Sequence, residues 1–109
     1  MLLQGKKAII TGGTRGIGFS VAEVFLKNGA SVALFGSRQE TVDKALAQLK
    51  AENPAWEVIG MAPDLTDYAA LDAAFSEVEN RFGRIDILVN NAGTVSYTHL
   101  RAHETEADL

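Results

Sequence analysis

The chain has 109 residues, of which 47% are hydrophobic and 22% are charged, and its formal net charge is −4. This length fits one small domain, and the acidic balance gives no electrostatic basis for binding nucleic acid or an anionic membrane. Cysteine is absent, which excludes a disulfide framework and a thiolate metal site. The first residues show no signal-peptide pattern, and no apolar run reaches the roughly 20 residues that span a bilayer. We therefore expect a cytoplasmic protein with neither nucleic acid nor a membrane as partner.

Short apolar runs alternate with longer amphipathic segments along most of the chain. Residues 7–11 predict a buried strand, and 17–28 predict a helix with Val21, Val24 and Phe25 on its apolar face. The elements expected after these are, in chain order, a strand at 31–35, a helix at 40–51, a strand at 57–61, a helix at 68–82 that Thr66-Asp67 can cap and Gly83 ends, and a strand at 85–89.

The order of these elements is βαβαβαβ. Strands that are apolar on both faces and alternate with helices predict a parallel sheet that is covered on both sides. With right-handed crossovers, this is the N-terminal half of a doubly wound α/β sheet of the Rossmann type. Ligands of such sheets bind outside the carboxyl ends of the strands, where Thr11, Phe35, Asp64 and Asn90 are expected. A side-chain amide at such an end can also tie neighbouring strands together.

A glycine-rich segment follows the first predicted strand and opens the first predicted helix. Its residues are Gly12, Gly13, Thr14, Arg15, Gly16, Ile17 and Gly18. Glycines permit a tight turn and let the backbone approach a pyrophosphate, and the N-terminus of a helix stabilises its negative charge. A glycine-rich turn without a ligand is the alternative, but the placement between strand and helix favours nucleotide binding.

Three segments together resemble the motifs of the short-chain dehydrogenase/reductase family. Thr11-Gly-x3-Gly-x-Gly18 is similar to the family's cofactor loop, and Asp64-Leu65 is similar to its adenine-contacting pair. Asn90-Asn91-Ala92-Gly93 is identical to its Asn-Asn-Ala-Gly motif. The resemblance covers residues 3–93, and it implies that the glycine loop, Asp64, Leu65, Asn91, Ala92 and Gly93 contact a nicotinamide dinucleotide. For Asp64, the residues alone also permit a place in a helix cap.

The residues after the second predicted strand bear on which cofactor is preferred. Selection of NAD needs an acidic residue there to bind the ribose 2′-hydroxyl, and Gly36-Ser37-Arg38 contains none. Arg38 can instead form a forked contact with a 2′-phosphate, and Ser37 can donate to it. Arg15 occupies the place of the second basic residue of NADPH-preferring family members. We expect NADP(H) to be preferred over NAD(H), with Glu40 too far along the chain to reverse this, although a solvated Arg38 is the alternative.

In the family, a Ser and a Tyr-x3-Lys pair are catalytic, with the Tyr as general acid and base. They follow the Asn-Asn-Ala-Gly motif by more residues than this chain contains, so we expect no catalytic residue within it. Tyr97 and Arg101, with Ser96 beside them, mimic the pair but follow the motif too closely. His99 and His103 are spaced i, i+4 without a matching third ligand, so no metal site is expected.

Residues 94–109 differ in character, with no clear hydrophobic period and no cap. Val95 to Thr105 resembles the in-frame translation of a transposon-end adapter used in preparing DNA sequencing libraries. We therefore expect a truncated dinucleotide-binding domain at 1–93 and a non-native tail at 94–109 that is not selected to pack. The fourth strand would then be an open sheet edge, and the isolated chain would be marginally stable or prone to aggregate.

The resemblance implies an oxidoreductase that transfers a hydride between NADP(H) and a carbonyl or alcohol. Its general likeness is to bacterial 3-oxoacyl-acyl-carrier-protein reductases, so the substrate would be a small molecule or an acyl-carrier-bound group. The whole enzyme would be a homo-oligomer, and the fragment itself would be inactive. A non-catalytic nucleotide-binding or redox-sensing protein on the same fold is the alternative, since fold does not determine function.

Overall fold

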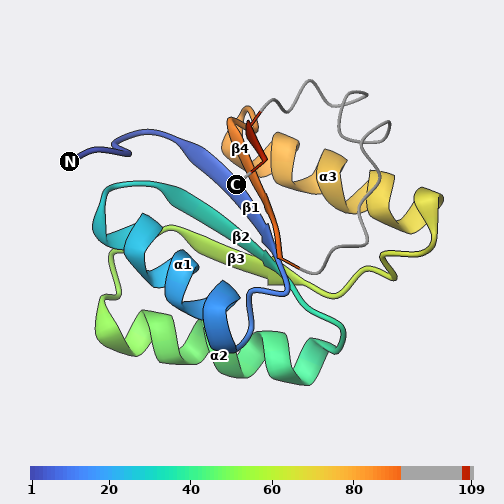
Figure 1. Ribbon diagram of the computed structural model, residues 1–109, viewed down its shortest axis with the longest axis horizontal. Helices are drawn as coiled ribbons and strands as arrows, with labels where there is room; N and C mark the ends of the chain where they lie inside the picture. The colour runs from blue at the N-terminus through green and yellow to red at the C-terminus, as the bar shows by residue number, and fades with distance from the viewer. Residues whose placement is uncertain (92–106, 109) are drawn as a thin grey trace.

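The computed structural model describes residues 1–91 and 107–108, whose arrangement Figure 1 shows. The elements are, in chain order, β1 (Lys7–Thr11), α1 (Gly16–Lys27), β2 (Ser31–Phe35), α2 (Gln39–Glu52), β3 (Val58–Met61), α3 (Tyr68–Phe82), β4 (Ile87–Asn90) and β5 (Ala107–Asp108). The three helices and the first four strands confirm the predicted elements, and no end differs by more than two residues.

The sheet is parallel, and its strand order is β3-β2-β1-β4-β5. Thr11 at the end of β1 lies opposite Phe35 at the end of β2 and Asn90 at the end of β4. One edge of the sheet therefore collects the carboxyl ends of the three central strands. Helices α1 and α2 cover one face and α3 covers the other (Figure 1). This is the Rossmann-type architecture that the sequence predicts.

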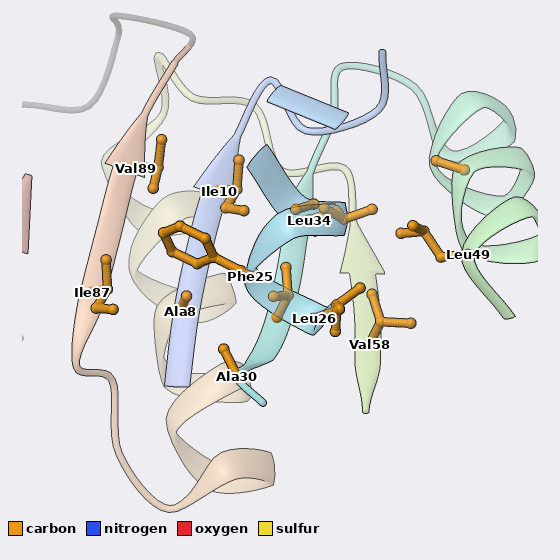
Figure 2. Packing of buried hydrophobic residues seen from close by; sticks show 13 residues of the cluster. Ala8, Ile10, Phe25, Leu26, Ala30, Leu34, Leu49, Val58, Ile87 and Val89 are labelled. Atoms are coloured by element: carbon orange, nitrogen blue, oxygen red, sulfur yellow. The ribbon is translucent and has the colours of Figure 1, made fainter. Parts of the chain in front are cut away.

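Alternate side chains of β1 enter two separate hydrophobic cores. Ala8 and Ile10 pack in the core that includes Phe25 of α1 (Figure 2). Ile9 packs on the opposite face in the core that includes Phe75 of α3. Burial of each large apolar side chain contributes about 1.5–3 kcal/mol. The two cores therefore hold β1 between helical layers and fix the point from which the glycine-rich loop departs.

The buried stripe of helix α1 differs from the predicted one at Val24. Phe25 is buried and Val21 packs partly buried against the same core, as expected. Val24, however, is 53% exposed, and Ala22 and Leu26 are buried against the sheet. Val24 lies with Ile17, which is 75% exposed, on a second apolar stripe of the helix. Both stripes have helical spacing, so periodicity alone did not identify the one that faces the sheet.

Helix α3 has both of its predicted boundary signals. The Asp67 carboxylate accepts hydrogen bonds from the backbone N–H groups of Ala69 and Ala70, at 2.9 and 3.3 Å. Gly83 ends the helix in the left-handed conformation, with φ 89°. Among the described residues, α1, α2 and α3 all lack the length and apolar character needed to cross a bilayer.

The fifth strand was not predicted. Ala107 and Asp108 pair with Ile87 and Leu88 of β4, so the sheet has a short strand where an open edge was expected. An edge strand presents unpaired backbone N–H and C=O groups, and another backbone segment can pair with them whatever its side-chain pattern. A two-residue pairing of this kind leaves no hydrophobic period in the sequence.

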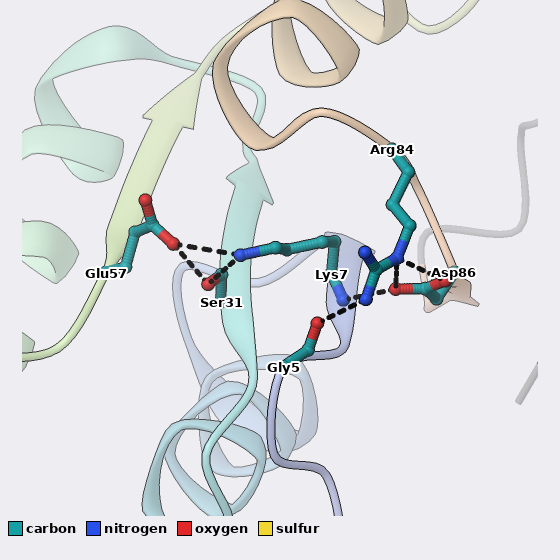
Figure 3. A network of polar contacts seen from close by, with 6 residues as sticks. All are labelled: Gly5, Lys7, Ser31, Glu57, Arg84 and Asp86. Atoms are coloured by element: carbon teal, nitrogen blue, oxygen red, sulfur yellow. Dashed lines mark hydrogen bonds and ion pairs between the residues drawn. The ribbon is translucent and has the colours of Figure 1, made fainter.

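A network of polar contacts lies where the strands begin, at the edge opposite to their carboxyl ends (Figure 3). The Lys7 ammonium donates to the Ser31 hydroxyl at 3.1 Å and pairs with the Glu57 carboxylate at 3.3 Å. The Ser31 hydroxyl donates to Glu57, and this bond, with Lys7, lowers the pKa of Glu57. The Lys7 backbone N–H donates to Asp86, which pairs with Arg84. The network joins the starts of β1, β2, β3 and β4.

Candidate functional site

The glycine-rich loop leaves β1 at the carboxyl edge of the sheet and leads directly into α1. Its turns need the left-handed conformation at Gly12 and Gly16, where φ is 66° and 62°. The Gly12 N–H donates to the carbonyl oxygen of Phe35 at 2.8 Å, which attaches the loop to the end of β2. Arg15 is the N-cap of α1 without a side-chain capping hydrogen bond, and the first turn contains no acidic residue. The helix therefore offers its N-terminal N–H groups and dipole to an anion.

Gly18 allows the loop to pack against the helix. A Cβ at Gly18 would lie 2.0 Å from the carbonyl oxygen of Gly12 and 2.9 Å from Nδ2 of Asn91. The Asn91 amide donates to that same Gly12 carbonyl at 3.1 Å. The segment that follows β4 thus holds the loop in place, and only glycine at position 18 leaves room for this contact.

Thr11 joins β1 to β4 below the loop. Its fully buried hydroxyl lies 3.2 Å from Oδ1 of Asn90 and 3.3 Å from the carbonyl oxygen of Val89. The predicted hydrogen bond between neighbouring strands, through a side-chain amide at a strand end, is therefore present between β1 and β4. Thr11 and Asn90 are also paired in register, so side-chain and backbone contacts both join β1 to β4 at the base of the site.

At the end of β2, Gly36 makes a close contact with the glycine-rich loop that the sequence did not predict. Gly36 donates its N–H to the carbonyl oxygen of Met61 at 3.1 Å. A Cβ on Gly36 would lie 2.6 Å from Cγ2 of Thr14 and 2.8 Å from Cγ2 of Val42. Gly36 therefore lets Thr14 of the loop approach β2. The available signal was a glycine directly after a buried strand, which often marks a close approach of this kind.

Asp64, which follows β3, has a local partner. Its carboxylate accepts from the Thr66 hydroxyl at 2.6 Å and from the Thr66 backbone N–H at 2.9 Å. These two hydrogen bonds lower the pKa of Asp64. The helix cap that the sequence allowed for Asp64 belongs to Asp67 instead.

Arg38 lies at the N-cap of α2, and its guanidinium forms an ion pair with Glu40. Both side chains are exposed, by 69% and 67%. The sequence alone places Glu40 too far along the chain to affect the choice of cofactor, whereas in the structure it is the partner of Arg38. Arg38 and Glu40 are two positions apart at the start of a helix, and a hydrophobic period in the sequence does not predict such a contact.

These segments enclose one pocket of about 580 Å³ at the carboxyl edge of the sheet. Its lining residues are Gly12, Thr14, Arg15, Phe35, Gly36, Ser37, Ala62, Pro63, Asp64 and Leu65. Six of the predicted site residues are thus brought together: Gly12, Thr14, Arg15, Ser37, Asp64 and Leu65. Gly16, Ile17, Gly18, Arg38 and Asn91 are outside this lining, while Ala92 and Gly93 lie outside the described residues.

The described part of the chain contains no group of three His, Cys, Asp or Glu side chains arranged to hold a metal ion. The residues that mimic catalytic or metal-binding groups in the sequence, Ser96, Tyr97, His99, Arg101 and His103, all lie outside the described residues.

The parallel sheet, with a glycine loop and a pocket at its carboxyl edge, defines a Rossmann-type nucleotide-binding fold. The family model for short chain dehydrogenases matches residues 6–108. A 3alpha-hydroxysteroid dehydrogenase from Mediterraneibacter gnavus is 51% identical over 106 residues, which are 97% of this chain and 42% of that relative. The chain belongs to the short-chain dehydrogenase family.

Solved structures agree with this assignment. A hydroxysteroid dehydrogenase from Escherichia coli aligns with a TM-score of 0.76 and 33% identity, over 84% of this chain and 36% of that one. A short chain dehydrogenase from Mycobacterium smegmatis aligns with a TM-score of 0.76 and 32% identity, over 83% of this chain and 37% of that one. The chain thus spans less than half the length of these relatives.

Proposed function

We propose that this chain is the cofactor-binding part of a dehydrogenase that moves a hydride between a nicotinamide dinucleotide and an alcohol or carbonyl group. The observation that carries the proposal is the pocket at the carboxyl edge, where the glycine loop, the end of β2 and the Asp64 turn converge. A volume of about 580 Å³ lies within the range of sites that hold small molecules and cofactors.

The residues present fit a dinucleotide. Because positions 18 and 36 are glycines, the loop can pack tightly against α1 and the end of β2. The N-terminus of α1 is suited to bind a pyrophosphate. Asp64 and Leu65 line the wall where an adenine would be held, and their family counterparts contact it. Asn91 would lie along the nicotinamide side. The bound cofactor supplies the hydride, while the protein supplies binding and orientation.

The same site supports a preference for NADP(H) over NAD(H). No carboxylate occurs at residues 36–38, where an acidic residue would bind a ribose 2′-hydroxyl. Arg15 and Ser37 line the pocket, and Arg38 follows directly. These three side chains can donate to a 2′-phosphate.

For the substrate, we propose a hydroxysteroid or its keto form. Two of the relatives named above are hydroxysteroid dehydrogenases, and one of them is 51% identical to this chain. The 3-oxoacyl-acyl-carrier-protein substrate expected from the sequence remains a prediction, and none of the relatives named above supports it. The acid–base groups are proposed to lie in the part of the enzyme that this chain does not include, so the chain alone is expected to give no turnover.

The test combines binding with turnover in the complete protein that contains this chain. Calorimetry should show binding of NADP⁺ and NAD⁺, with NADP⁺ bound more tightly. Formation of NADPH should then follow addition of a 3α-hydroxysteroid but not of a 3-hydroxyacyl thioester. Cofactor binding without turnover on either substrate would favour the non-catalytic alternative. Failure to bind either dinucleotide would refute the proposal.

A further inference from the structure

We infer that Glu40 is a specificity-determining residue that weakens the preference for NADP(H) by holding the guanidinium of Arg38. This inference rests on the proposed function, since it concerns how the same site distinguishes a 2′-phosphate from a 2′-hydroxyl. It adds a residue that lies outside the pocket lining and is two positions beyond the basic residue it controls.

The first observation is the ion pair itself. Nη2 of Arg38 contacts Oε1 of Glu40, and the pocket is lined by Ser37 but not by Arg38. The one guanidinium that follows β2 is therefore already paired with a carboxylate. A 2′-phosphate beside Ser37 must compete with Glu40 for Arg38.

The second observation is that the local backbone keeps the two residues in place. The carbonyl oxygen of Arg38 accepts from the Thr41 hydroxyl at 2.9 Å and from the Val42 N–H at 3.1 Å. Glu40 lies in the first turn of α2, where the helix dipole favours a negative charge. The backbone positions from which the two side chains meet are thus set by the start of the helix.

The electrostatic consequence differs between the two cofactors. A 2′-phosphate brings a charge of about −1.5 to −2, which Glu40 repels and which Arg38, while it is paired with Glu40, attracts less strongly. A 2′-hydroxyl carries no charge and is nearly indifferent to Glu40. Both side chains are exposed, so water and salt reduce the effect. Removal of the Glu40 charge should therefore strengthen NADP⁺ binding by about five- to tenfold at low ionic strength.

The test measures dissociation constants of NADP⁺ and NAD⁺ by calorimetry, in the complete protein and without substrate. Glu40→Gln should tighten NADP⁺ about five- to tenfold and leave NAD⁺ within about twofold, and added salt should reduce the gain. In an Arg38→Gln background, the same change should give a clearly smaller gain, because only the direct repulsion by Glu40 is removed and no guanidinium is released. Glu77→Gln is the matched control, since it removes an exposed carboxylate from the Arg81 ion pair on α3 and should change neither constant.

Two outcomes would overturn the inference alone. In the first, Glu40→Gln leaves the NADP⁺ constant unchanged. In the second, it weakens NAD⁺, which would make Glu40 an acceptor for the ribose hydroxyl. A wild-type protein that binds neither dinucleotide would instead overturn the proposed function, and the inference with it.

Discussion

The change of Gly18 to alanine tests whether the loop, α1 and the segment after β4 form one tightly packed unit. The added Cβ would lie 2.0 Å from the carbonyl oxygen of Gly12, 2.8 Å from its carbonyl carbon and 2.9 Å from Nδ2 of Asn91. Since Cβ atoms essentially never lie closer than 3.0 Å to such neighbours, the loop must move by about 1 Å. The obstacle is backbone, so no side-chain rotation can relieve it.

The size of the effect follows from three opposing contributions. Alanine in place of glycine within a helix favours the folded state by about 1 kcal/mol. Overpacking disfavours it by about 1–3 kcal/mol, and loss of the Asn91–Gly12 hydrogen bond costs a further 0.5–1.5 kcal/mol, roughly. We therefore expect a net loss of about 0.5–3.5 kcal/mol in the free energy of unfolding. The displaced loop should also weaken NADP⁺ binding by about tenfold or more, equal to about 1.4 kcal/mol.

The assays are thermal unfolding without cofactor and calorimetric titration with NADP⁺, on the complete protein. Ser20→Ala is the control, because Ser20 is exposed on the same helix and its change adds no atom. It should leave both the melting temperature and the dissociation constant nearly unchanged. A Gly18→Ala protein that is as stable as the wild type and binds NADP⁺ within twofold would show that the packing described for the loop is wrong.

Two further changes test other parts of the structure. Gly36→Ala should lower the melting temperature, because the new Cβ meets Cγ2 of Thr14 at 2.6 Å, and Thr14→Ser should restore part of the loss; no rescue would contradict this contact. The lowered pKa of Glu57 means that its contribution to stability is complete above the ordinary pKa of 4.5 and is lost as pH falls through the lowered value. Glu57→Gln should therefore lower the free energy of unfolding at pH 7, by no more than about 1 kcal/mol for so exposed a group, and this loss should disappear as pH falls through the lowered pKa of Glu57; an equal loss at pH 7 and in acid would refute the assignment.

Hydrophobic runs and turn residues were enough to locate most of the fold. Buried strands such as β2 are continuous apolar segments, and Gly83 and Asp67 mark helix ends by backbone conformation and capping, which are local properties. The rule that ligands bind at carboxyl ends of parallel strands predicted a site at the edge of the sheet where the pocket lies.

The sequence was less informative about contacts between segments. The exposed Val24 and the buried Ala22 have equally acceptable helical spacing, so only the packed structure distinguishes them. The close approach of Thr14 to Gly36 depends on how β1 and β2 pair in register. The partner of Arg38 depends on the backbone direction at the start of α2, which no hydrophobic pattern encodes.

The most direct test of the central claim is hydrogen–deuterium exchange of the complete protein with and without NADP⁺. If the carboxyl edge binds the dinucleotide, protection should increase in three separate peptides, which cover residues 12–18, 36–38 and 62–66. Peptides that cover the opposite edge, around Lys7, Ser31 and Glu57, should not change. Protection confined to that opposite edge, or absent from all three predicted peptides at saturating NADP⁺, would contradict the proposed cofactor site.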